Sequence, residues 1–553
     1  MGMYAFGPWT VDLRGDELAD IRHRGLPVLR GLRAVVRNRN WLTLTPSVVS
    51  CRVEETGESL RLALDVEWAG YTDRYAGRVS VVLDGLSVSV VFEGTAVAEF
   101  ASNRIGLVVL HRPDDAGRAV TVTSPAGVLR ESAFPEHISA HQPFLDIAAL
   151  SWERDGVAYQ LDFGGDVFET EDQRNWTDAS FKTYSTPLSR PFPVMHREGD
   201  TVSQSIRLSA RQVVRVGSET VGVVPELGIS AGGSLLAELA SDPLTGPDLS
   251  LGLGSLLAEL ASDPSPGSGC VSVEAAVEVA SRLGLPLDAR IAAVSPADAV
   301  AVLRSLPLDR VVRLGVYSAS SHLTDQALWD AVAVEAKELD YDGELLAGAR
   351  SHFTELNRNP GSALPEADAV TYSITPQMHA VEREAVVETL AIQSLTAREA
   401  GRIAGGRPLH VGPVTLAPRF NAVATETPLA DELPAHDPLQ ETPFAAAWLL
   451  GSVSALTVPG VASVSYGVGL GSPAGELLLQ LASLRGRDVL TADAGAGSLV
   501  AYPVQMADGV VVLLGNLTGF ASLARVVGPS GDHWDVELAP WQTTALRNFG
   551  KES

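Results

Sequence analysis

The segment FETEDQRNWTDASFKTY, residues 168–184, holds more charged side chains than a surface strand or a core strand requires. Three carboxylates, Glu169, Glu171 and Asp172, stand just before Arg174. An unpaired carboxylate in a protein interior either costs several kcal/mol or takes up a proton. The segment is therefore expected to be either a solvated loop or one wall of a polar pocket.

An extended backbone would divide these side chains between two faces. Glu169 and Glu171 would share one face, and Asp172 and Arg174 would share the other. A pair between Arg174 and either Asp172 or Asp178 would hold a carboxylate ionised, whereas a partly buried Glu171 without a cation would have a raised pKa. The segment thus offers both a base and a structural anchor.

Further polar side chains follow buried strands in the second half of the chain. They are His352, Glu355, Asn357 and Arg358 in HFTELNRN, Gln377 and His379 in SITPQMHA, Arg419 and Asn421 in TLAPRFNA, and the uncharged Tyr466 in SYGVGLG. As a set they are rich in hydrogen-bond donors and suit a polyhydroxylated ligand that is uncharged or weakly acidic. Glu355 is the strongest candidate for a base among them.

Other mechanisms lack their motifs. The chain has no GxSxG nucleophile elbow, no HExxH and no glycine-rich phosphate loop in the right context. His137 and His141 have i, i+4 spacing, but they lie in a region rich in strands, where no helix would present them together. We therefore expect acid–base chemistry by carboxylates, with no metal and no cofactor.

The elements that must position these groups change along the chain. Up to about residue 218, apolar and polar residues alternate with period two, as in Leu60 to Trp68, which is typical of half-buried strands. From about residue 222, short apolar strands alternate with amphipathic helices. The candidate strands are 224–231, 270–274, 287–294, 311–318, 344–357, 369–375, 408–416 and 461–469. Thr324 is the expected cap of one helix, and Gly405 the expected end of another.

The expected fold class is therefore multidomain, α/β plus β. It comprises an N-terminal antiparallel β-sandwich over residues 1–220, a central (β/α)8 TIM barrel over 221–475 and a small C-terminal β-sandwich over 476–553. Active-site groups of a barrel hang from the C-terminal ends of its strands. Because 168–184 lies near the domain junction in the sequence, we expect it to line the same cleft as those strand ends.

The net charge and composition of the chain limit the kind of molecule that it can bind. The 553 residues carry 41 basic and 67 acidic side chains, so the net charge is −26, which argues against nucleic acid and anionic membrane as partners. Two cysteines make no disulfide framework, and no apolar leader or membrane span is present. We expect a cytoplasmic protein that acts on a small molecule. The sequence makes no prediction about the oligomeric state.

One internal repeat stands out. GSLLAELASDP occurs at 233–243 and again, identically, at 254–264. Both copies are expected to form a short helix that ends at Asp-Pro. Two copies make no solenoid, so a recent local duplication in a barrel loop is the simplest account.

Several segments resemble the D-apionate lactonases of bacterial apiose catabolism. They are NRIGLVVLH (103–111), AGRAVTVTSPAG (116–127), FPEHISAHQPFLDI (134–147), GDVFETEDQRNWTDASFKTYSTPLSRPFP (165–193), HFTELNRN (352–359), SITPQMHA (373–380) and PVTLAPRFN (413–421). The match runs from about residue 3 into the C-terminal β region. The resemblance implies a β-domain, TIM-barrel, β-domain architecture and the hydrolysis of a sugar lactone to its aldonic acid.

Lactone hydrolysis needs a base for the attacking water and a donor for the oxyanion. Glu355, Asp172 or Glu171 would be the base, and Arg174 or Lys182 would lie near the oxyanion. The expected substrate-binding set is completed by Asn175, Asp178, Asn357, His379, Arg419 and Asn421.

Two alternatives stay open at this stage. A retaining glycosidase shares the barrel and its flanking β domains, but it requires two carboxyl groups about 5–5.5 Å apart across the pocket, and strands seven and eight offer none. A sugar-binding protein that has lost catalysis is the second alternative, because Gly467 stands where the lactonase family often has a glutamate.

Overall fold

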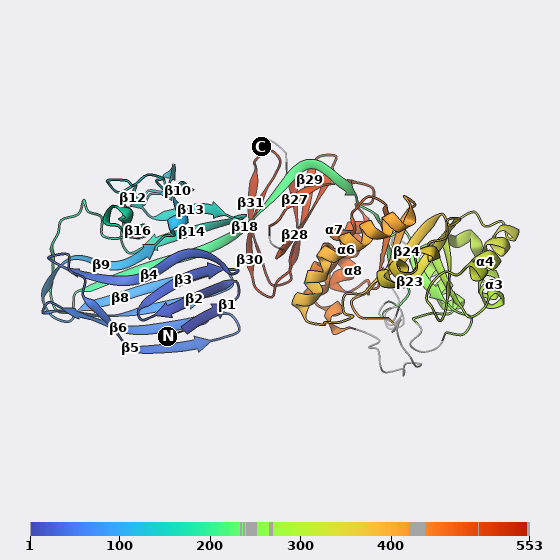
Figure 1. Ribbon diagram of the computed structural model, residues 1–553, viewed down its shortest axis with the longest axis horizontal. Coiled ribbons are helices and arrows are strands. Elements are labelled where there is room, and N and C mark those ends of the chain that lie inside the picture. Colours follow the sequence, from blue (N-terminus) through green and yellow to red (C-terminus); the bar gives the residue numbers. More distant parts are fainter. Residues whose placement is uncertain are drawn as a thin grey trace. The chain divides into compact units, whose positions relative to one another are not determined.

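The computed structural model describes residues 2–232, 235, 238, 252–264, 269–419, 437–495 and 497–549. The chain divides into two compact units (Figure 1). The N-terminal unit comprises Met1–Val214, Gly519–Val526 and Trp534–Glu537, and the barrel unit comprises Arg215–Thr518, Val527–His533 and Leu538–Ser553. The expected fold class is confirmed by antiparallel strands first, a closed parallel barrel next and further strands last. The boundaries at residues 220 and 475 stay a prediction.

One sheet of the N-terminal unit carries the 168–184 segment. Its strands, in spatial order, are β1 (Gly2–Phe6), β2 (Trp9–Arg14), β3 (Glu17–His23), β4 (Leu26–Asn38), β9 (Phe100–Leu110), β16 (Phe181–Tyr184), β15 (Phe168–Asp172) and β12 (Phe144–Ile147), with β17 (Val194–His196) also paired to β9. All these neighbours run antiparallel. One face of this sheet packs on the core, so the opposite face is left for polar side chains.

The second sheet of this unit covers the other side of the core. Its strands are β5 (Thr45–Glu55), β6 (Leu60–Gly70), β7 (Asp73–Leu83), β8 (Ser87–Ala96), β10 (Ala119–Thr123), β11 (Leu129–Ala133), β13 (Ala149–Arg154), β14 (Val157–Gly164) and the first part of β18 (Thr201–Val223), together with β30 (Ser522–Val527) and β31 (His533–Leu538). The alternation expected from Leu60 to Trp68 is confirmed, because every second residue of β6 is buried there. Trp9, Trp68 and Phe92 lie in the core between the sheets.

The barrel unit is built on eight parallel strands that close on themselves. They are β19 (Glu226–Ser230), β20 (Leu256–Leu260), β21 (Leu287–Ala293), β22 (Val311–Ser318), β23 (Glu344–His352), β24 (Ala369–Ile374), β25 (Leu409–Val414) and β26 (Val461–Tyr466). The strands are buried along nearly their whole length, as parallel strands covered by helices must be.

Helices surround this barrel (Figure 1). The described helices are α2 (Val273–Leu283), α3 (Pro296–Arg304), α4 (Gln326–Glu338), α5 (Phe353–Arg358), α6 (Arg383–Ala404), α7 (Pro443–Leu456) and α8 (Pro473–Ala482), with 3-10 turns η1 (Pro113–Asp115), η2 (Gln173–Trp176), η3 (Leu308–Arg310), η4 (Pro360–Ser362) and η5 (Pro438–Glu441). The remaining strands of the unit are β27 (Asp488–Asp493), β28 (Leu499–Met506), β29 (Gly509–Asn516) and β32 (Thr543–Phe549).

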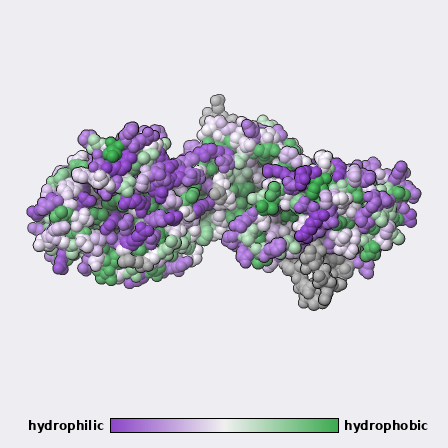
Figure 2. All heavy atoms as spheres, viewed as in Figure 1, coloured by the Kyte–Doolittle hydropathy of each residue, from purple (hydrophilic) through white to green (hydrophobic). Residues whose placement is uncertain are grey.

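In the described part of the chain, no helix has the length and apolar character needed to cross a membrane. Hydrophilic and hydrophobic residues are interspersed on the visible surface of both units (Figure 2).

The second barrel strand was expected at 270–274, and this expectation is wrong. The strand is β20, which lies in the second copy of the repeat and pairs with β19 on one side and β21 on the other. Val271 forms only an isolated bridge to Leu260. The helix expected for this copy is therefore also wrong, because two neighbouring strands supply the backbone partners that outweigh its helical propensity. The first copy lies largely outside the described residues.

Two helix ends were predicted from local sequence signals, and one of the two predictions is confirmed. α6 ends at Gly405 in the left-handed region, with φ of 64°, as expected. The cap of α4 is Asp325, whose carboxylate accepts from the Leu328 N–H at 3.0 Å, and the expectation of Thr324 is wrong. The Thr324 hydroxyl instead donates to the carbonyl of Val316 at 2.8 Å, which ties the loop to β22.

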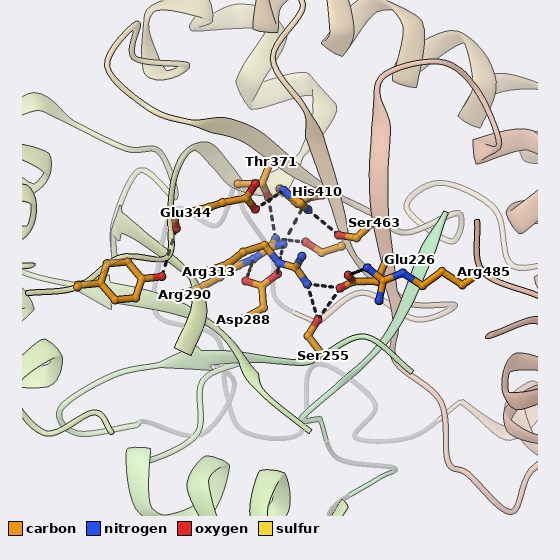
Figure 3. Close-up of polar contacts among 12 residues, drawn as sticks. Glu226, Ser255, Asp288, Arg290, Arg313, Glu344, Thr371, His410, Ser463 and Arg485 are labelled. Atoms are coloured by element: carbon orange, nitrogen blue, oxygen red, sulfur yellow. Dashed lines mark hydrogen bonds and ion pairs between the residues drawn. The ribbon is translucent and has the colours of Figure 1, made fainter. Parts of the chain in front are cut away.

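An ion-pair network fills the barrel interior near the N-terminal ends of the strands (Figure 3). Asp288 pairs with Arg290 at 3.1 Å and with Arg313 at 3.2 Å. Burial raises the pKa of Asp288, but the two guanidinium groups outweigh burial and hold this pKa below its usual value. Glu344, the first residue of its strand, lies 3.0 Å from His410. Polar groups at the N-terminal ends of the strands contribute to the stability of a barrel. Catalytic groups are therefore expected at the opposite face, where the strands end.

Candidate functional site

A cavity of about 530 Å³ lies at the C-terminal ends of β23 and β24. Its lining residues are His352, Phe353, Thr354, Glu355, Arg358, Tyr372, Ser373, Ile374, Thr375, Pro376, Met378, His379, Thr389, Ile392, Gln393 and Thr396. The cavity therefore brings together four of the strand-end residues named from the sequence: His352, Glu355, Arg358 and His379. Among these described lining residues, Glu355 is the only carboxylic acid.

The position of Glu355 follows from a change of secondary structure that the sequence did not indicate. The strand expected over 344–357 ends at His352, and α5 begins at Phe353. Glu355 thus stands in the first turn of α5 rather than on the strand. Its Oε2 atom accepts a hydrogen bond from the Ser351 hydroxyl at 3.0 Å, and the side chain is half-buried. Ser351 therefore orients the carboxylate, and no cation in the described residues pairs with it.

His352 contributes a polar atom that is not satisfied. Its Nε2 atom is buried and has no hydrogen-bond partner among the described residues. Burial lowers the pKa of His352 below its usual value, the Glu355 carboxylate raises it and Arg419 lowers it further. The imidazole is therefore neutral near pH 7. Buried polar atoms are nearly always bonded, so an unbonded one in a cavity wall marks a place for a ligand or water.

Ser373 repeats this pattern on the neighbouring strand. Its hydroxyl is buried and lacks a partner within the described residues. Arg358 and His379 also line the cavity, but their side chains are exposed and can adjust to a ligand. Gln377 donates instead to the Asp437 carboxylate. The cavity therefore combines one oriented carboxylate with several donors.

Three further barrel residues, Asn357, Arg419 and Asn421, were predicted to bind substrate. Asn357 is exposed and does not line the cavity, and Asn421 lies outside the described residues. Arg419 forms an ion pair with Glu259 of β20 and donates to the carbonyl of Arg350 at 2.8 Å. The Arg350 guanidinium also lies 3.4 Å from the same Glu259 carboxylate. One buried carboxylate is thus shared by two guanidinium groups in the upper half of the barrel.

Glu259 was missed because its segment was interpreted as a helix outside the barrel. Read as the strand β20, the segment places Glu259 one residue before the strand end, where barrels carry functional groups. The only sequence signal for this strand is that it falls between two other buried apolar strands. Periodicity alone does not separate a short buried strand from a short helix.

In the N-terminal unit, the 168–184 segment forms the hairpin β15–β16 around η2. Asp172 is buried and accepts three hydrogen bonds from Arg174, at 2.8, 2.8 and 3.2 Å, and one from the Ser139 N–H at 2.8 Å. Burial raises the pKa of Asp172, but these bonds outweigh it and leave the pKa below its usual value. Both oxygens of this carboxylate are therefore occupied.

Arg174 and Asn175 connect the hairpin to the segment 134–147. The Arg174 guanidinium donates to the carbonyls of Pro135, Glu136 and His137, and it stacks 4.5 Å from the Phe181 ring centroid. The Asn175 side chain donates to the carbonyl of Ser139. These contacts hold two loops together, which accounts for the spacing of the polar residues in the motif.

Glu171 and Lys182 face away from the core on neighbouring strands. They form an ion pair, and the Trp176 indole N–H donates to Glu171 at 3.0 Å. Burial lowers the pKa of Lys182, and Glu171 partly restores it. Asp178 is exposed: its N–H donates to the carbonyl of Gln173 at 3.2 Å, and its carboxylate makes no hydrogen bond within the described residues. The expectation that this segment shares a cleft with the barrel strand ends stays a prediction.

Gly467 is packed against its surroundings. A Cβ atom at this position would lie 2.7 Å from Cγ2 of Thr415, so a side chain here would require Thr415 to move. The Gly467 N–H donates to Val414, and its carbonyl accepts from Gln440 at 3.0 Å. The glycine thus belongs to the packing of this chain rather than leaving a gap in it.

The described part of the chain contains no group of three His, Cys, Asp or Glu side chains that could hold a metal ion. A role for a metal therefore finds no ligand set among these residues.

Comparison with known proteins covers most of the chain. The family model for the N-terminal domain of D-apionate lactonase matches residues 2–213, and the model for the TIM barrel domain of D-apionate lactonase matches residues 257–477. A curated D-apionate lactonase of Brucella anthropi is 28% identical over 464 residues, which are 76% of this chain and 74% of that protein.

Solved structures are less similar. A GH30 endoxylanase of Clostridium papyrosolvens C71 is 11% identical, with 60% of this chain and 98% of that chain covered and a TM-score of 0.38. A GH36 alpha-galactosidase of Geobacillus stearothermophilus is 10% identical, with 95% and 93% covered and a TM-score of 0.28. Both TM-scores are too low to carry an argument about this chain.

Proposed function

We propose that this chain, which belongs to the D-apionate lactonase family, hydrolyses a sugar lactone to its aldonic acid. The curated relative from Brucella anthropi carries the name of this activity. The structural support is a cavity that contains a single oriented carboxylate, Glu355, beside the neutral His352. One base and several neutral or cationic donors are what ester hydrolysis by water requires.

The number of carboxylates favours a lactonase over a retaining glycosidase. A retaining glycosidase needs a nucleophile and an acid about 5–5.5 Å apart. Within the described cavity lining, Glu355 has no second carboxylic acid beside it. Glu259, the other buried carboxylate near the strand ends, is held by two guanidinium groups. A carboxylate that two guanidinium groups engage is a poor candidate for the proton donor to a leaving group.

In the proposed reaction, Glu355 takes a proton from a water molecule while the water oxygen attacks the lactone carbonyl carbon, C1. The carbonyl oxygen becomes an oxyanion, which N–H donors of the cavity stabilise. When the carbonyl forms again, the bond between C1 and the ring oxygen breaks, and Glu355 returns the proton to that oxygen. The product is the open-chain aldonic acid, which then ionises.

Several residues serve as donors in this scheme. Arg358 and the Nε2 atom of His352 are the nearest candidates for the oxyanion, since both belong to the cavity wall with Glu355. His379 and the unbonded Ser373 hydroxyl would hold ring hydroxyls. Asn357, Arg419 and Asn421 stay proposals for substrate binding.

Residues of the 168–184 segment are the alternative choice for the base and for the oxyanion donor. Glu171 and Asp172 remain alternative bases, and Arg174 and Lys182 alternative oxyanion donors. The pairing of Asp172 with Arg174 favours a structural role for both side chains. The oxygens of Asp172 and the N–H groups of Arg174 that form this pair are not available to a substrate. Asn175 bonds to Ser139, and Asp178 is exposed.

The substrate we propose is a five-membered aldonolactone such as D-apionolactone, in the breakdown of apiose in the cytoplasm. The cavity volume of about 530 Å³ lies in the ordinary range for small-molecule sites and leaves room for the attacking water. The pathway follows from the family, and the location from the low cysteine content.

Acid release in a pH-stat, corrected for spontaneous hydrolysis, tests the proposal. The full chain should hydrolyse D-apionolactone or D-ribonolactone and leave aryl glycosides of xylose and arabinose unchanged. Turnover of an aryl glycoside without lactone hydrolysis would establish the glycosidase alternative. Binding of the lactones without turnover of either class would indicate a sugar-binding protein.

A further inference from the structure

The polar face of the first sheet in the N-terminal unit carries an unusual set of cations. Arg37 of β4 and Arg104 of β9 are direct partners in the antiparallel register. Directly opposed residues of neighbouring strands point to the same face, and like charges in such a pair are destabilising. Two arginines thus occupy paired positions on one face of the sheet, in a chain whose net charge is −26.

Arg104 is the more unusual of the two. The residue is only 7% exposed, and its Nη1 atom donates to the carbonyl of Asn103. Its Nε and Nη2 atoms are buried and have no hydrogen-bond partner among the described residues. A buried charged donor without a partner costs the full desolvation of that group, so this edge of the guanidinium is built for an acceptor that the described residues do not supply.

Two aromatic rings cover the Arg104 guanidinium. Its central carbon lies 5.1 Å from the ring centroid of Trp41 and 5.2 Å from that of Phe192. Trp41 stands in the turn that follows β4, and Asn103 fixes this turn by donating to the carbonyl of Arg39 at 2.9 Å. Both rings are themselves partly exposed. A ligand therefore reaches the edge of Arg104 by displacing one of these rings, not by crossing the core.

The cationic character extends to β16. Lys182 is buried beside Arg37, and Arg37 contributes to lowering its pKa, after burial and against the opposing effect of Glu171. Glu171 already pairs with Lys182. The Arg37 backbone pairs with Arg104 and Thr43, but its guanidinium makes no hydrogen bond or ion pair with any described residue. One positive charge on this face is therefore not balanced by a partner in contact with it.

Groups that bind hydroxyls border the cations. The Glu169 carboxylate is buried and accepts from the Tyr184 hydroxyl at 2.5 Å and from the Leu188 N–H at 2.8 Å. Glu169 and Asp166 both act electrostatically on Arg104, yet neither forms an ion pair with it. Acceptors are thus near the guanidinium without occupying its open edge.

We propose that Arg37 and Arg104 form a binding site for the carboxylate of a polyhydroxylated acid, on the N-terminal unit and separate from the barrel cavity. The parallel Nε–H and Nη2–H bonds of Arg104 fit the two oxygens of a planar carboxylate. Glu169 and Tyr184 bind hydroxyls of the same ligand, and Trp41 packs on its carbon chain. Phosphate shares the anionic chemistry and can also bind this fork through two oxygens, but it lacks the hydroxyls that Glu169 and Tyr184 would bind.

The site does not rest on the lactonase assignment, since it concerns binding and uses no residue of the barrel. Its test is isothermal titration of the full chain with sodium D-gluconate, which carries both the carboxylate and the hydroxyls. Sorbitol, acetate and inorganic phosphate are titrated in parallel. Gluconate should bind at least about tenfold more tightly than each of the three, because each lacks one part of the recognition.

Two variants locate the binding. Arg104→Met and Arg37→Met should each weaken gluconate binding about tenfold or more, the value of a lost charged hydrogen bond. Arg112→Met is the matched control, because Arg112 lies in the same unit and already pairs with Asp114 at 2.8 Å. Arg37 is only half-buried, so Arg37→Met keeps the test valid if Arg104→Met fails the check of folding by circular dichroism.

Three outcomes would overturn the inference. Gluconate binding that is unchanged in both variants would place the ligand elsewhere, for example in the barrel cavity. Sorbitol binding as tightly as gluconate would show that the charge is not recognised. Phosphate binding more tightly than gluconate would replace the carboxylate by a phosphate as the ligand of Arg37 and Arg104.

Discussion

The 168–184 hairpin and the barrel cavity contain similar side chains but bond them differently. In the hairpin, Asp172 accepts four hydrogen bonds and Glu171 pairs with Lys182. In the cavity, Glu355 accepts one hydrogen bond from Ser351, and the buried Nε2 of His352 accepts or donates none among the described residues. Charge density is therefore higher in the hairpin, while unused bonding capacity is higher in the cavity.

This difference separates two uses of polar residues. A carboxylate whose oxygens are all bonded contributes to folding and has little capacity left for a substrate. A carboxylate that accepts one hydrogen bond, from a neutral hydroxyl, keeps oxygen lone pairs for a substrate or water. Dense charge in a sequence thus indicates a network, whereas chemistry is expected where the structure leaves acceptors open. The predictions that follow test this division, beginning with the largest effect.

Replacement of Glu355 should give the largest effect on activity. Glu355→Gln keeps the shape and the bond from Ser351 but removes the base, so kcat for an aldonolactone should fall roughly 10²–10⁴-fold. The melting temperature should stay close to that of the wild type. Azide or formate should not restore activity, because no covalent glycosyl intermediate exists. A glycosyl azide product would support the glycosidase mechanism, and an unchanged kcat would move the base to Glu171 or Asp172.

Replacement of Asp172 should have the opposite signature. Asp172→Asn removes a buried, fully bonded charge opposite Arg174, and the unfolding free energy of the N-terminal unit should fall by roughly 3 kcal/mol. The kcat of the folded protein should change less than twofold or so. Urea unfolding followed by fluorescence, together with kinetics below the transition, measures both. Asp178→Asn at an exposed position is the control and should alter neither. A large loss of kcat with normal stability would make Asp172 catalytic.

His352 should separate function from stability in a third way. His352→Leu removes the unbonded Nε2 atom from a buried place, so the protein should be as stable as the wild type or slightly more stable. We expect kcat/KM for the lactone to fall about tenfold, the value of one lost hydrogen bond to the substrate. Steady-state kinetics and thermal unfolding are compared for the same preparation. Lower stability with unchanged kcat/KM would show that His352 is a packing residue.

The pH dependence of stability sharpens the contrast. The pKa of Asp172 is lowered in the folded state, so its contribution is present above the unfolded pKa of about 3.9 and disappears as pH falls through the folded value. The difference in unfolding free energy between wild type and Asp172→Asn should be constant from about pH 8 to 5 and shrink below about pH 4. A difference that already shrinks near pH 6 would contradict the bonded, ionised state of Asp172.

Removal of metal ions should have no effect on activity. Prolonged dialysis against a strong chelator should leave lactone hydrolysis intact, because the proposed base is a carboxylate. The check is the initial rate before and after dialysis, with zinc and manganese added back separately. A loss that either metal restores would assign the base to metal-bound water.

The sequence predicted the fold class well because its main signals are periodic. Alternation over Leu60 to Trp68 and the buried runs of the barrel are set by which face meets the core, and these predictions are confirmed. The local signal at Gly405 is also confirmed, since a left-handed helix end favours glycine.

The errors have physical causes as well. The sequence LLAEL has high helical propensity, yet Leu256–Leu260 is a strand because β19 and β21 supply its backbone partners. No local pattern reports such non-local pairing. The same error hid Glu259.

The candidate site was predicted in part for a similar reason. Glu355 and His379 were found because both follow buried strands, and the cavity brings them together. Which polar groups lack partners is not visible in a sequence, since it depends on contacts between distant segments, such as Arg174 with the carbonyls of Pro135 and Glu136. Arg104, which stands in the largely apolar strand β9, was missed on the same ground.

A crystal structure of Glu355→Gln with a bound aldonolactone tests the central claim most directly. We expect the lactone carbonyl carbon to lie in the barrel cavity, within reach of residue 355 and of His352, with no second carboxylate facing C1. A lactone bound with two carboxyl groups about 5–5.5 Å apart on either side of C1 would establish the glycosidase arrangement instead. A lactone bound to the 168–184 hairpin, away from Glu355, would contradict the assignment of the base.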